Sequence, residues 1–247
     1  MDDSPAADPL SPKYRRVVLK LSGDGFGLSG KSGISIDETL NIARQAQRVV
    51  KRGVQLAIVV GGGNFLRGAQ LSAGGSVIKE ATADYMGMLA TVLNGLALQD
   101  ALESLNCQTR LQTAIRMESV AEPYIRRRAI RHLEKGRIAI FAAGTSNPYF
   151  STDTGATLRA LEIKADVIAK ATRVDGVFDK DPLKFPDAVQ YREISYLEVL
   201  SQGLGVMDAT AIAMCRDNRL PIIVFNLNTT GNIMRMSRGE SVGTVIH

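Results

Sequence analysis

The stretch Ala57-Ile-Val-Val-Gly-Gly-Gly-Asn-Phe-Leu-Arg-Gly68 decides the fold, because an apolar, β-branched run stops at three consecutive glycines. Such a run predicts a buried strand of a parallel sheet, over residues 54–60. Glycine backbone at the end of a strand lets a ligand approach the N–H groups closely, and Arg67 can grip an oxyanion with two N–H groups. The stretch therefore predicts a phosphate-binding turn at a strand end, with an ordinary glycine turn as the alternative.

Strand-like and helix-like segments alternate along the rest of the chain. The apolar patterns predict strands over 16–21, 54–60, 109–113, 137–142, 167–171, 189–194, 221–226 and 243–246. They predict helices over 37–51 (with Asp37 as the N-cap), 83–105, 125–134, 153–163, 196–202 and 209–218. The 83–105 helix is apolar around much of its girth, which predicts that it is buried or lies at a subunit contact. Short glycine-containing connections between these segments predict an α/β fold with a mainly parallel sheet.

Length and composition limit the classes of protein that remain. The chain has 247 residues, of which 45% are hydrophobic and 22% charged, and a net charge of +5. Residues 1–13 are rich in Pro and Asp and predict a disordered tail, so 14–247 is expected to form one domain with two lobes. Two cysteines and two histidines match no metal motif or disulfide framework, which favours a reducing, cytoplasmic setting. We expect no membrane segment and no nucleic-acid partner, because long apolar runs and a basic stripe with aromatic residues are missing.

Gly25-Phe-Gly-Leu-Ser-Gly-Lys-Ser32 matches the Walker A pattern letter for letter and follows a predicted strand. A working P-loop needs a helix that begins at its Lys-Ser pair, so that the helix N-terminus faces the phosphates. Here Gly33 follows at once, and the predicted helix begins only at Asp37. The context therefore favours a glycine- and serine-rich loop near the site over a P-loop.

Three predicted strand ends carry residues that suit phosphates. Lys20-Leu-Ser-Gly23 places an ammonium beside a small hydroxyl and a glycine, and the triple glycine is the second such turn. The third is the polar loop 144–153, which follows the predicted 137–142 strand and offers hydroxyl, amide and aromatic groups. Ligands of parallel α/β sheets bind at the carboxyl ends of the strands. In this loop Asp153 is expected to be the N-cap of the helix that follows.

At this point the chain resembles a known family. Six motifs occur in the order seen in bacterial uridylate kinases of the amino-acid-kinase superfamily: Lys20-Leu-Ser-Gly, Gly-Gly-Gly-Asn-x-x-Arg-Gly, Asp84-Tyr-Met-Gly-Met-Leu-Ala-Thr91, Thr145-Ser-Asn-Pro-Tyr-Phe-Ser-Thr-Asp, Lys170-Ala-Thr-Arg-Val-Asp-Gly-Val-Phe178 and Val206-Met-Asp208. The resemblance covers residues 14–246. It implies a three-layer α/β/α sandwich, with an N-terminal acceptor lobe and a C-terminal ATP lobe. It also implies a hexamer that transfers the γ-phosphoryl of ATP to UMP with Mg²⁺ carried by the nucleotide, and inhibition by UTP.

The resemblance also implies roles for individual residues. Lys20, Lys170 and Asp208 would be catalytic, with Asp208 as the carboxylate that organises the lysines and no residue assigned as a metal ligand. ATP would contact Lys20, Leu21, Ser22, Gly23, Gly63, Arg67, Thr172, Phe178 and Asp181. UMP would contact Gly62, Asp84, Thr145, Ser146, Asn147, Pro148, Tyr149, Phe150, Ser151 and Thr152.

Simpler roles stay open for four of these residues. Asp84 and Asp208 could be helix caps, Lys170 a structural cation at a strand end, and Phe178 a core residue. Two other functions also stay open. One is a kinase of the same superfamily that phosphorylates a carboxylate, such as acetylglutamate or aspartate. The other is a binding or storage protein of this fold without turnover.

Overall fold

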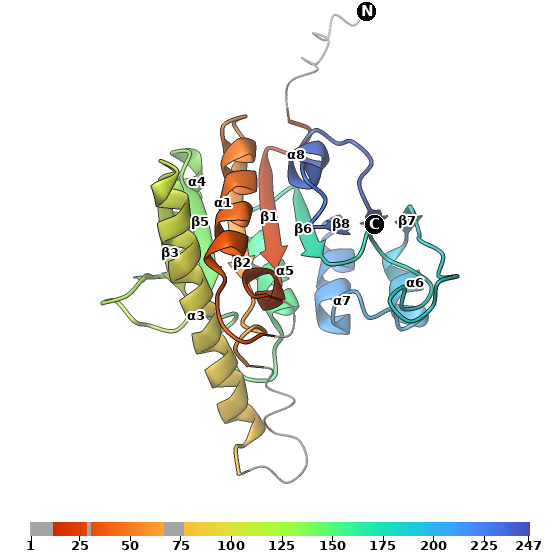
Figure 1. The fold of residues 1–247 in the computed structure, drawn as a ribbon, viewed down its shortest axis with the longest axis horizontal. Coiled ribbons are helices and arrows are strands. Elements are labelled where there is room, and N and C mark those ends of the chain that lie inside the picture. Colours follow the sequence, from red (N-terminus) through yellow and green to blue (C-terminus); the bar gives the residue numbers. More distant parts are fainter. Residues whose placement is uncertain (1–11, 29–30, 67–76) are drawn as a thin grey trace, which may run out of the picture.

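A nine-stranded sheet forms the centre of the computed structural model, which describes residues 12–28, 31–66 and 77–247 (Figure 1). Its strand order is β4-β3-β5-β2-β1-β6-β8-β9-β7, and the pairs are parallel except β8 with β9. The strands are β1 (Arg16–Leu21), β2 (Gln55–Val60), β3 (Thr109–Thr113), β4 (Glu122–Pro123), β5 (Ile138–Ala142), β6 (Val167–Thr172), β7 (Glu193–Ile194), β8 (Ile222–Asn226) and β9 (Thr244–Ile246). The prediction of a mainly parallel sheet is confirmed.

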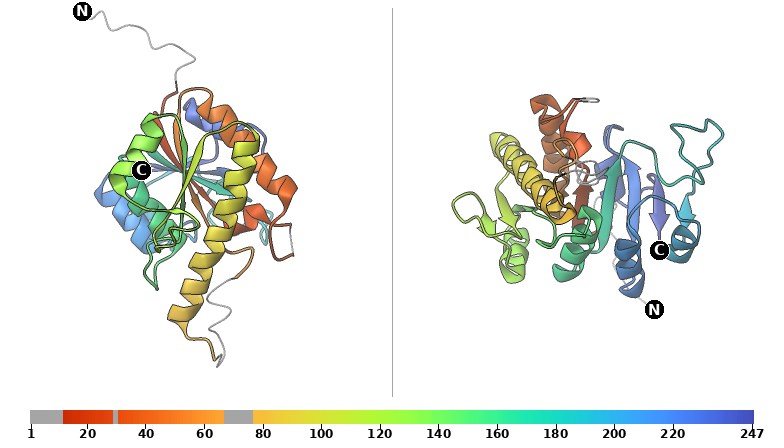
Figure 2. Two further views of the ribbon diagram at one scale, coloured as in Figure 1. Left: turned by 90° about the vertical axis from the view of Figure 1, so that its left-hand side faces the viewer. Right: turned by 90° about the horizontal axis from the view of Figure 1, so that it is seen from below.

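Helices cover both faces of the sheet, which confirms the three-layer α/β/α sandwich (Figure 2). One face packs against α1 (Ile36–Val50), α3 (Glu80–Ser104) and α8 (Asn232–Ser237). The other packs against α4 (Arg126–Glu134), α5 (Thr152–Glu162), α6 (Tyr196–Ser201) and α7 (Ala209–Asp217). Alternation along a strand assigns each side chain to a layer: Val17 and Leu19 belong to the first core and Val18 to the second. Lys20 has the parity of Val18, so its side chain extends toward the α5–α7 layer.

The triple glycine lies where β2 ends and passes between two other backbones. A Cβ on Gly62 would lie 2.7 Å from the carbonyl oxygen of Gly87 in α3, and one on Gly23 would collide with the Gly63 nitrogen. Among the described residues, a Cβ on Gly63 would have only an Asp24 carboxylate oxygen near it, 3.7 Å away. Close packing of the protein itself therefore requires Gly62, whereas Gly63 has room for a side chain in this structure.

Asn64 fastens this turn to the long helix. Its amide exchanges hydrogen bonds with the buried Asn94 of α3, at 3.0 and 2.7 Å, and Asn94 also donates to the Gly61 carbonyl at 2.7 Å. Asn64 further donates to the Gly33 carbonyl at 2.9 Å, which holds the loop before α1 against the turn. Buried amides that satisfy one another fix local geometry, because an unpaired partner would be costly.

Several element boundaries differ from the sequence prediction. Helix α1 begins at Ile36 and is capped by Ser35, whose hydroxyl accepts from the Glu38 N–H, so the prediction of Asp37 as N-cap is wrong. Of the predicted 189–194 strand only β7 forms, because residues 189–192 make no regular hydrogen-bond ladder with a neighbouring strand in the described part of the chain. Three short elements were not predicted: the 3-10 turn η1 (Gly23–Phe26), β4 and α8. Residues 31–35 are not helical, as the argument against a P-loop requires.

Candidate active site

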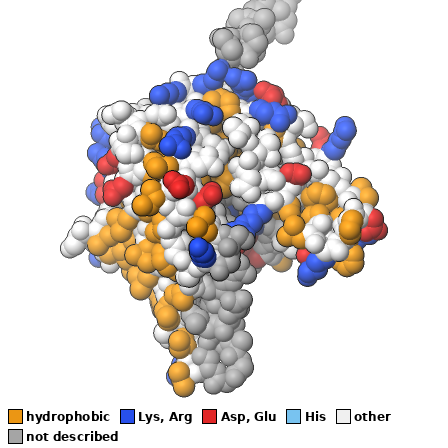
Figure 3. Space-filling view, in the orientation of Figure 1, with side chains coloured by type: hydrophobic (Ala, Val, Ile, Leu, Met, Phe, Trp, Pro, Cys, Tyr) orange, Lys and Arg blue, Asp and Glu red, His pale blue; other side chains and the backbone are white. Residues whose placement is uncertain are grey.

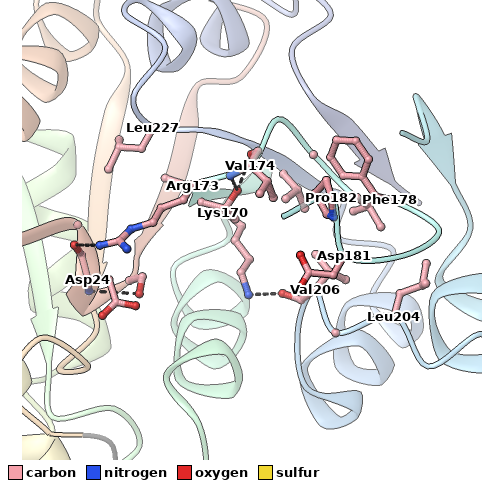
Figure 4. A pocket seen from close by; sticks show the side chains of 18 of the residues that line it. Asp24, Lys170, Arg173, Val174, Phe178, Asp181, Pro182, Leu204, Val206 and Leu227 are labelled. Atoms are coloured by element: carbon pink, nitrogen blue, oxygen red, sulfur yellow. Dashed lines mark hydrogen bonds between the residues drawn. The ribbon is translucent and has the colours of Figure 1, made fainter. Parts of the chain in front are cut away.

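Two cavities open near the carboxyl ends of the parallel strands, where the three predicted loops meet. The larger, of about 990 Å³, lies between the ends of β1 and β6 and the segments 176–182 and 202–206 (Figure 4). The smaller, of about 170 Å³, is lined by the glycine turn, the start of α3 and parts of the 144–152 loop. Arg67, which was predicted to contact ATP, lies outside the described residues.

A lysine–aspartate–lysine cluster connects the two cavities. Lys20 and Lys170 lie side by side in register on β1 and β6, and both line the larger cavity. Asp153 follows Thr152 of the smaller cavity, and its carboxylate lies 2.8 Å from the Lys20 Nζ and 2.7 Å from the Lys170 Nζ. The three side chains are only 9%, 12% and 14% exposed for Lys20, Lys170 and Asp153. The cluster has a net charge of +1 and faces a cavity, an arrangement that attracts phosphates.

The protonation of this cluster follows from burial and charge together. Burial acts to raise the pKa of Asp153, but the ammonium groups of Lys20 and Lys170 outweigh it and hold that pKa below its ordinary value. Burial lowers the pKa of Lys170, against the opposing effect of Asp153. Asp153 is therefore a carboxylate at neutral pH and cannot serve as a proton donor there. Lys170 also donates to the Val206 carbonyl (Figure 4).

Two of the predicted roles for carboxylates change in this structure. Asp153 is not the N-cap of α5: Ser151 caps that helix, and its hydroxyl accepts from the Asp153 and Thr154 N–H groups at 3.0 and 3.2 Å. Asp153, rather than Asp208, contacts both lysines. Asp208 caps α7 through the Ala211 N–H at 2.9 Å, as the simpler alternative proposed.

Asp208 has a second set of contacts, which tie it to the start of α5. Its carboxylate accepts from the Thr154 hydroxyl at 2.9 Å and from the Ser151 hydroxyl. These two residues lie on either side of Asp153 in the sequence. The Asp208 carboxylate thus joins the N-termini of α5 and α7 through the residues on either side of Asp153.

On the side of the smaller cavity, Asp84 lies in the second turn of α3 and does not cap it, because the N-cap is Lys79. Its carboxylate accepts from the Tyr149 N–H at 2.7 Å, which fixes the 144–152 loop to α3. The loop backbone is strained, with φ of 62° at Ala143, 66° at Ser146 and 69° at Tyr149. Non-glycine residues in the left-handed region are costly and persist where the surroundings impose them, most often at ligand sites.

The remaining predicted site residues divide between the two cavities. Ser22, Thr172, Phe178 and Asp181 line the larger one, together with the two lysines. Gly62, Gly63, Asp84, Phe150 and Thr152 line the smaller one, so Gly63 lies on the side of Gly62 here. Leu21 is buried, Gly23 packs on the glycine turn, and Thr145, Ser146, Asn147, Pro148, Tyr149 and Ser151 belong to the same loop without lining either cavity.

Sequence reasoning missed Asn94 and Thr154 and gave Asp153 the wrong role. A polar residue within an apolar helix could have pointed to Asn94, which is fully buried. For Asp153, the signal was that Ser151 and Asp153 lie two positions apart and are both N-cap residue types, although only one of them can cap the helix. Both histidines lie away from the cavities: His132 contacts Glu122 at 3.0 Å, and His247 ends the chain.

Comparisons with known proteins agree with this geometry. Residues 15–226 match the amino acid kinase family. The chain resembles the crystal structure of UMP kinase from Bacillus anthracis at 39% identity and a TM-score of 0.90, over 95% of this chain and 96% of that one. UMP kinase from Ureaplasma parvum is similar at 35% identity and 0.87, over 94% and 98%, respectively. Uridylate kinase from Archaeoglobus fulgidus is similar at 32% identity and 0.71, over 94% and 99%. The strand-end lysines, the glycine turn and the matched family together show that the chain belongs to the amino acid kinase family.

Proposed function

We propose that this chain is a UMP kinase, which transfers the γ-phosphoryl group of ATP to UMP and releases ADP and UDP. The support from the molecule is that two cavities, one large and one small, converge on the Lys20–Asp153–Lys170 cluster. A transfer between two phosphates needs positioning and positive charge more than covalent help. The solved proteins that the chain resembles at 32–39% identity are UMP kinases and a uridylate kinase.

We assign ATP to the larger cavity and UMP to the smaller. Lys20 and Lys170 then face the transferring phosphoryl group, and Ser22 and the glycine turn contact the phosphates. We assign Thr172, Phe178 and Asp181, which also line the larger cavity, to the ATP base and ribose. Asp84 and the 145–152 loop hold UMP. The chain is one domain, whose N-terminal part binds the acceptor and whose C-terminal part binds ATP.

The cluster itself supplies the electrostatic part of the reaction. Two ammonium groups and one carboxylate leave one positive charge for the transferred group, which develops negative charge on its oxygens. Asp153 holds both ammonium groups in place without removing a proton. A phosphate-monoester nucleophile is already ionised, so the reaction needs no histidine base.

Mg²⁺ fits this site as a companion of the nucleotide. Within the described ranges, no group of three or more His, Cys, Asp or Glu side chains could hold a metal ion. Mg²⁺ keeps several waters and is bound through substrate phosphates with few protein carboxylates. It would arrive on the phosphates in the larger cavity and neutralise part of their charge.

The long helix supports a homo-oligomer, and a hexamer is the assembly that the resemblance implies. Tyr85, Leu89 and Leu93 recur every four residues on α3 and are 45%, 50% and 48% exposed. Figure 3 shows hydrophobic side chains gathered over this helix. An apolar row of this kind usually meets another protein surface. Light scattering after size exclusion measures the assembly directly.

Cytoplasmic localisation and inhibition by UTP complete the proposal. In the part of the chain that the structure describes, no helix is long and apolar enough to cross a bilayer. UTP shares the uracil of UMP and the triphosphate of ATP, so it should compete at one of the two cavities.

A coupled assay of ADP release with ATP, Mg²⁺ and each nucleoside monophosphate tests the proposal. We expect turnover with UMP well above that with CMP, AMP or GMP. Release of ADP with acetylglutamate or aspartate instead would support the carboxylate-kinase alternative. ATP binding in calorimetry without ADP release with any acceptor would support a binding protein, and either result would overturn the proposal.

A further inference from the structure

We propose that Thr154 is a positioning residue for phosphoryl transfer, which acts through Asp208 to fix the Asp153 carboxylate between the two lysines. This inference deepens the proposed function and rests on it for its kinetic readout.

The Thr154 hydroxyl joins α5 to α7 and is not needed to form α5 itself. Thr154 is only 4% exposed, and its hydroxyl donates to the Asp208 carboxylate at 2.9 Å, on the side of α5 that faces α7. It is the third residue of α5, where the backbone N–H already bonds the Ser151 cap. The side-chain bond is therefore not needed to begin the helix. It joins α5 to a second helix.

The Asp208 carboxylate carries three bonds, and two of them come from α5 and its cap. It accepts from Thr154, from Ser151 and from the Ala211 N–H of α7. Hydrogen bonds to a buried or half-buried charged group are about twice as strong as neutral ones. One carboxylate thus clamps residues 151 and 154, and the residue that pairs with both lysines lies between them.

Asp153 is sensitive to that clamp, because its backbone belongs to the first turn of α5. Its two lysine partners come from strands that are fixed within the sheet. A small rotation of the first turn of α5 would move the carboxylate away from one Nζ and toward the other. The segment before Asp208 also accepts from Lys170 through the Val206 carbonyl, so one segment orients both the lysine and its partner.

Ser151 extends the clamp to the acceptor side. It belongs to the loop whose Phe150 and Thr152 line the smaller cavity. A nucleotide that orders this loop would tighten the Ser151–Asp208 bond and with it the place of Asp153. Thr154 then contributes to the rate of the transfer rather than to the binding of either nucleotide.

The test compares three variants in the steady-state assay with UMP. Thr154→Val removes the hydroxyl and keeps the branched shape, and we expect kcat to fall on the order of tenfold or more, with both KM values little changed. Thr154→Ser keeps the hydroxyl and should restore most of kcat. Thr39→Val is the matched control: Thr39 is a buried threonine in the first turn of α1, and its hydroxyl donates to the Ser35 carbonyl and contacts neither Asp153 nor Asp208.

A double-mutant cycle tests the route through Asp208. In an Asp208→Ala background, Thr154→Val should change kcat less than twofold, since the acceptor of its bond is already lost. If the double mutant lost kcat by the full product of the two single-mutant effects, the proposed route through Asp208 would be overturned. Equal losses of kcat in Thr154→Val and Thr39→Val, or a Thr154→Val enzyme with wild-type kcat, would overturn the role itself.

A readout without substrate separates this inference from the proposed function. The ammonium NMR signals of Lys20 and Lys170 should shift in Thr154→Val and stay in place in Thr39→Val. Unchanged signals in Thr154→Val would refute the inference even if the protein used another acceptor. Conversely, shifted signals in a wild-type-like fold that never turns over UMP would refute only the UMP kinase proposal.

Discussion

Replacing Asp153 with asparagine should destabilise the nucleotide-free protein by about 3–5 kcal/mol, the usual cost of leaving a buried charge without its partner. Each lysine–carboxylate contact, at 2.8 and 2.7 Å, is worth about 6 kcal/mol before desolvation at an effective dielectric constant of about 20. Side-chain exposures of 9–14% leave little water to screen the two ammonium groups that remain.

The loss has an upper limit, because a lysine can give up its proton. From an ordinary lysine pKa, neutralisation at pH 7 costs about 4.6 kcal/mol, and burial already lowers the pKa of Lys170. The free energy of unfolding of the variant should therefore be lower than that of the wild type by about this amount, and by little more. Because ATP brings negative charge to the same place, saturating ATP should recover part of the lost stability.

Urea unfolding at pH 7, with and without ATP, measures both effects. Asp37→Asn is the matched control, since Asp37 is also the second residue of a helix but is exposed. Its loss should be limited to the helix-dipole effect of about 0.3–1 kcal/mol. If Asp153→Asn unfolded within about 0.5 kcal/mol of the wild type, the three buried charges could not form the cluster described here.

Three further predictions concern the glycine turn, the pH profile and the two lysine motifs. Gly62→Ala should lower the free energy of unfolding by roughly 1–3 kcal/mol, because its Cβ would press on the α3 backbone. Gly63→Ala should keep the wild-type urea midpoint but weaken nucleotide binding in calorimetry. Equal urea midpoints for the two variants would contradict the packing described for Gly62. Because burial lowers the pKa of Lys170, kcat should fall with rising pH at a midpoint below the ordinary lysine value, and folding stability should rise over the same window, where the unfolded chain binds the extra proton. Lys170→Arg should move that fall in kcat to higher pH, and an unmoved profile would assign it to another group. Lys20→Ala should lower kcat by about 10²-fold or more, whereas Lys31→Ala, in the Walker-like loop, should stay near wild type, and the reverse order would restore the P-loop interpretation.

The fold could be predicted from local patterns because most of its elements carry strong ones. The buried strands β1, β2 and β5 are dominated by apolar residues, and their predicted bounds agree with the structure to within one residue. Elements that depend on partners distant in the sequence were not predicted. β4 has two residues and exists only through its pairing with β3, and α8 has six residues and begins after a glycine with a left-handed φ of 90°. Neither leaves a periodic signal in so short a window.

The site shows the same division between local and distant information. Lys20 could be picked out because it lies near the end of a predicted strand, two residues before Ser22, whereas Lys170 was indicated only by the resemblance to the family's motif. The partner of both could not, since Asp153 lies 133 residues beyond Lys20 and comes to it only through the sheet order β2-β1-β6. The local sequence also led to a wrong N-cap. Ser151 and Asp153 both suit that position, and only the observed backbone shows that the serine takes it.

The position of α5 explains why a helix cap and a charge cluster occur within three residues. The first turn of a helix favours negative charge and supplies free N–H groups, so Ser151 can satisfy the backbone while Asp153 turns to the lysines. The same turn borders the smaller cavity through Thr152 and the second helix through Thr154. The smaller cavity, the lysine pair and the α7 terminus are therefore all in contact with one turn of helix. Any substitution that loosens this turn should change the rate before it changes the affinity for either nucleotide.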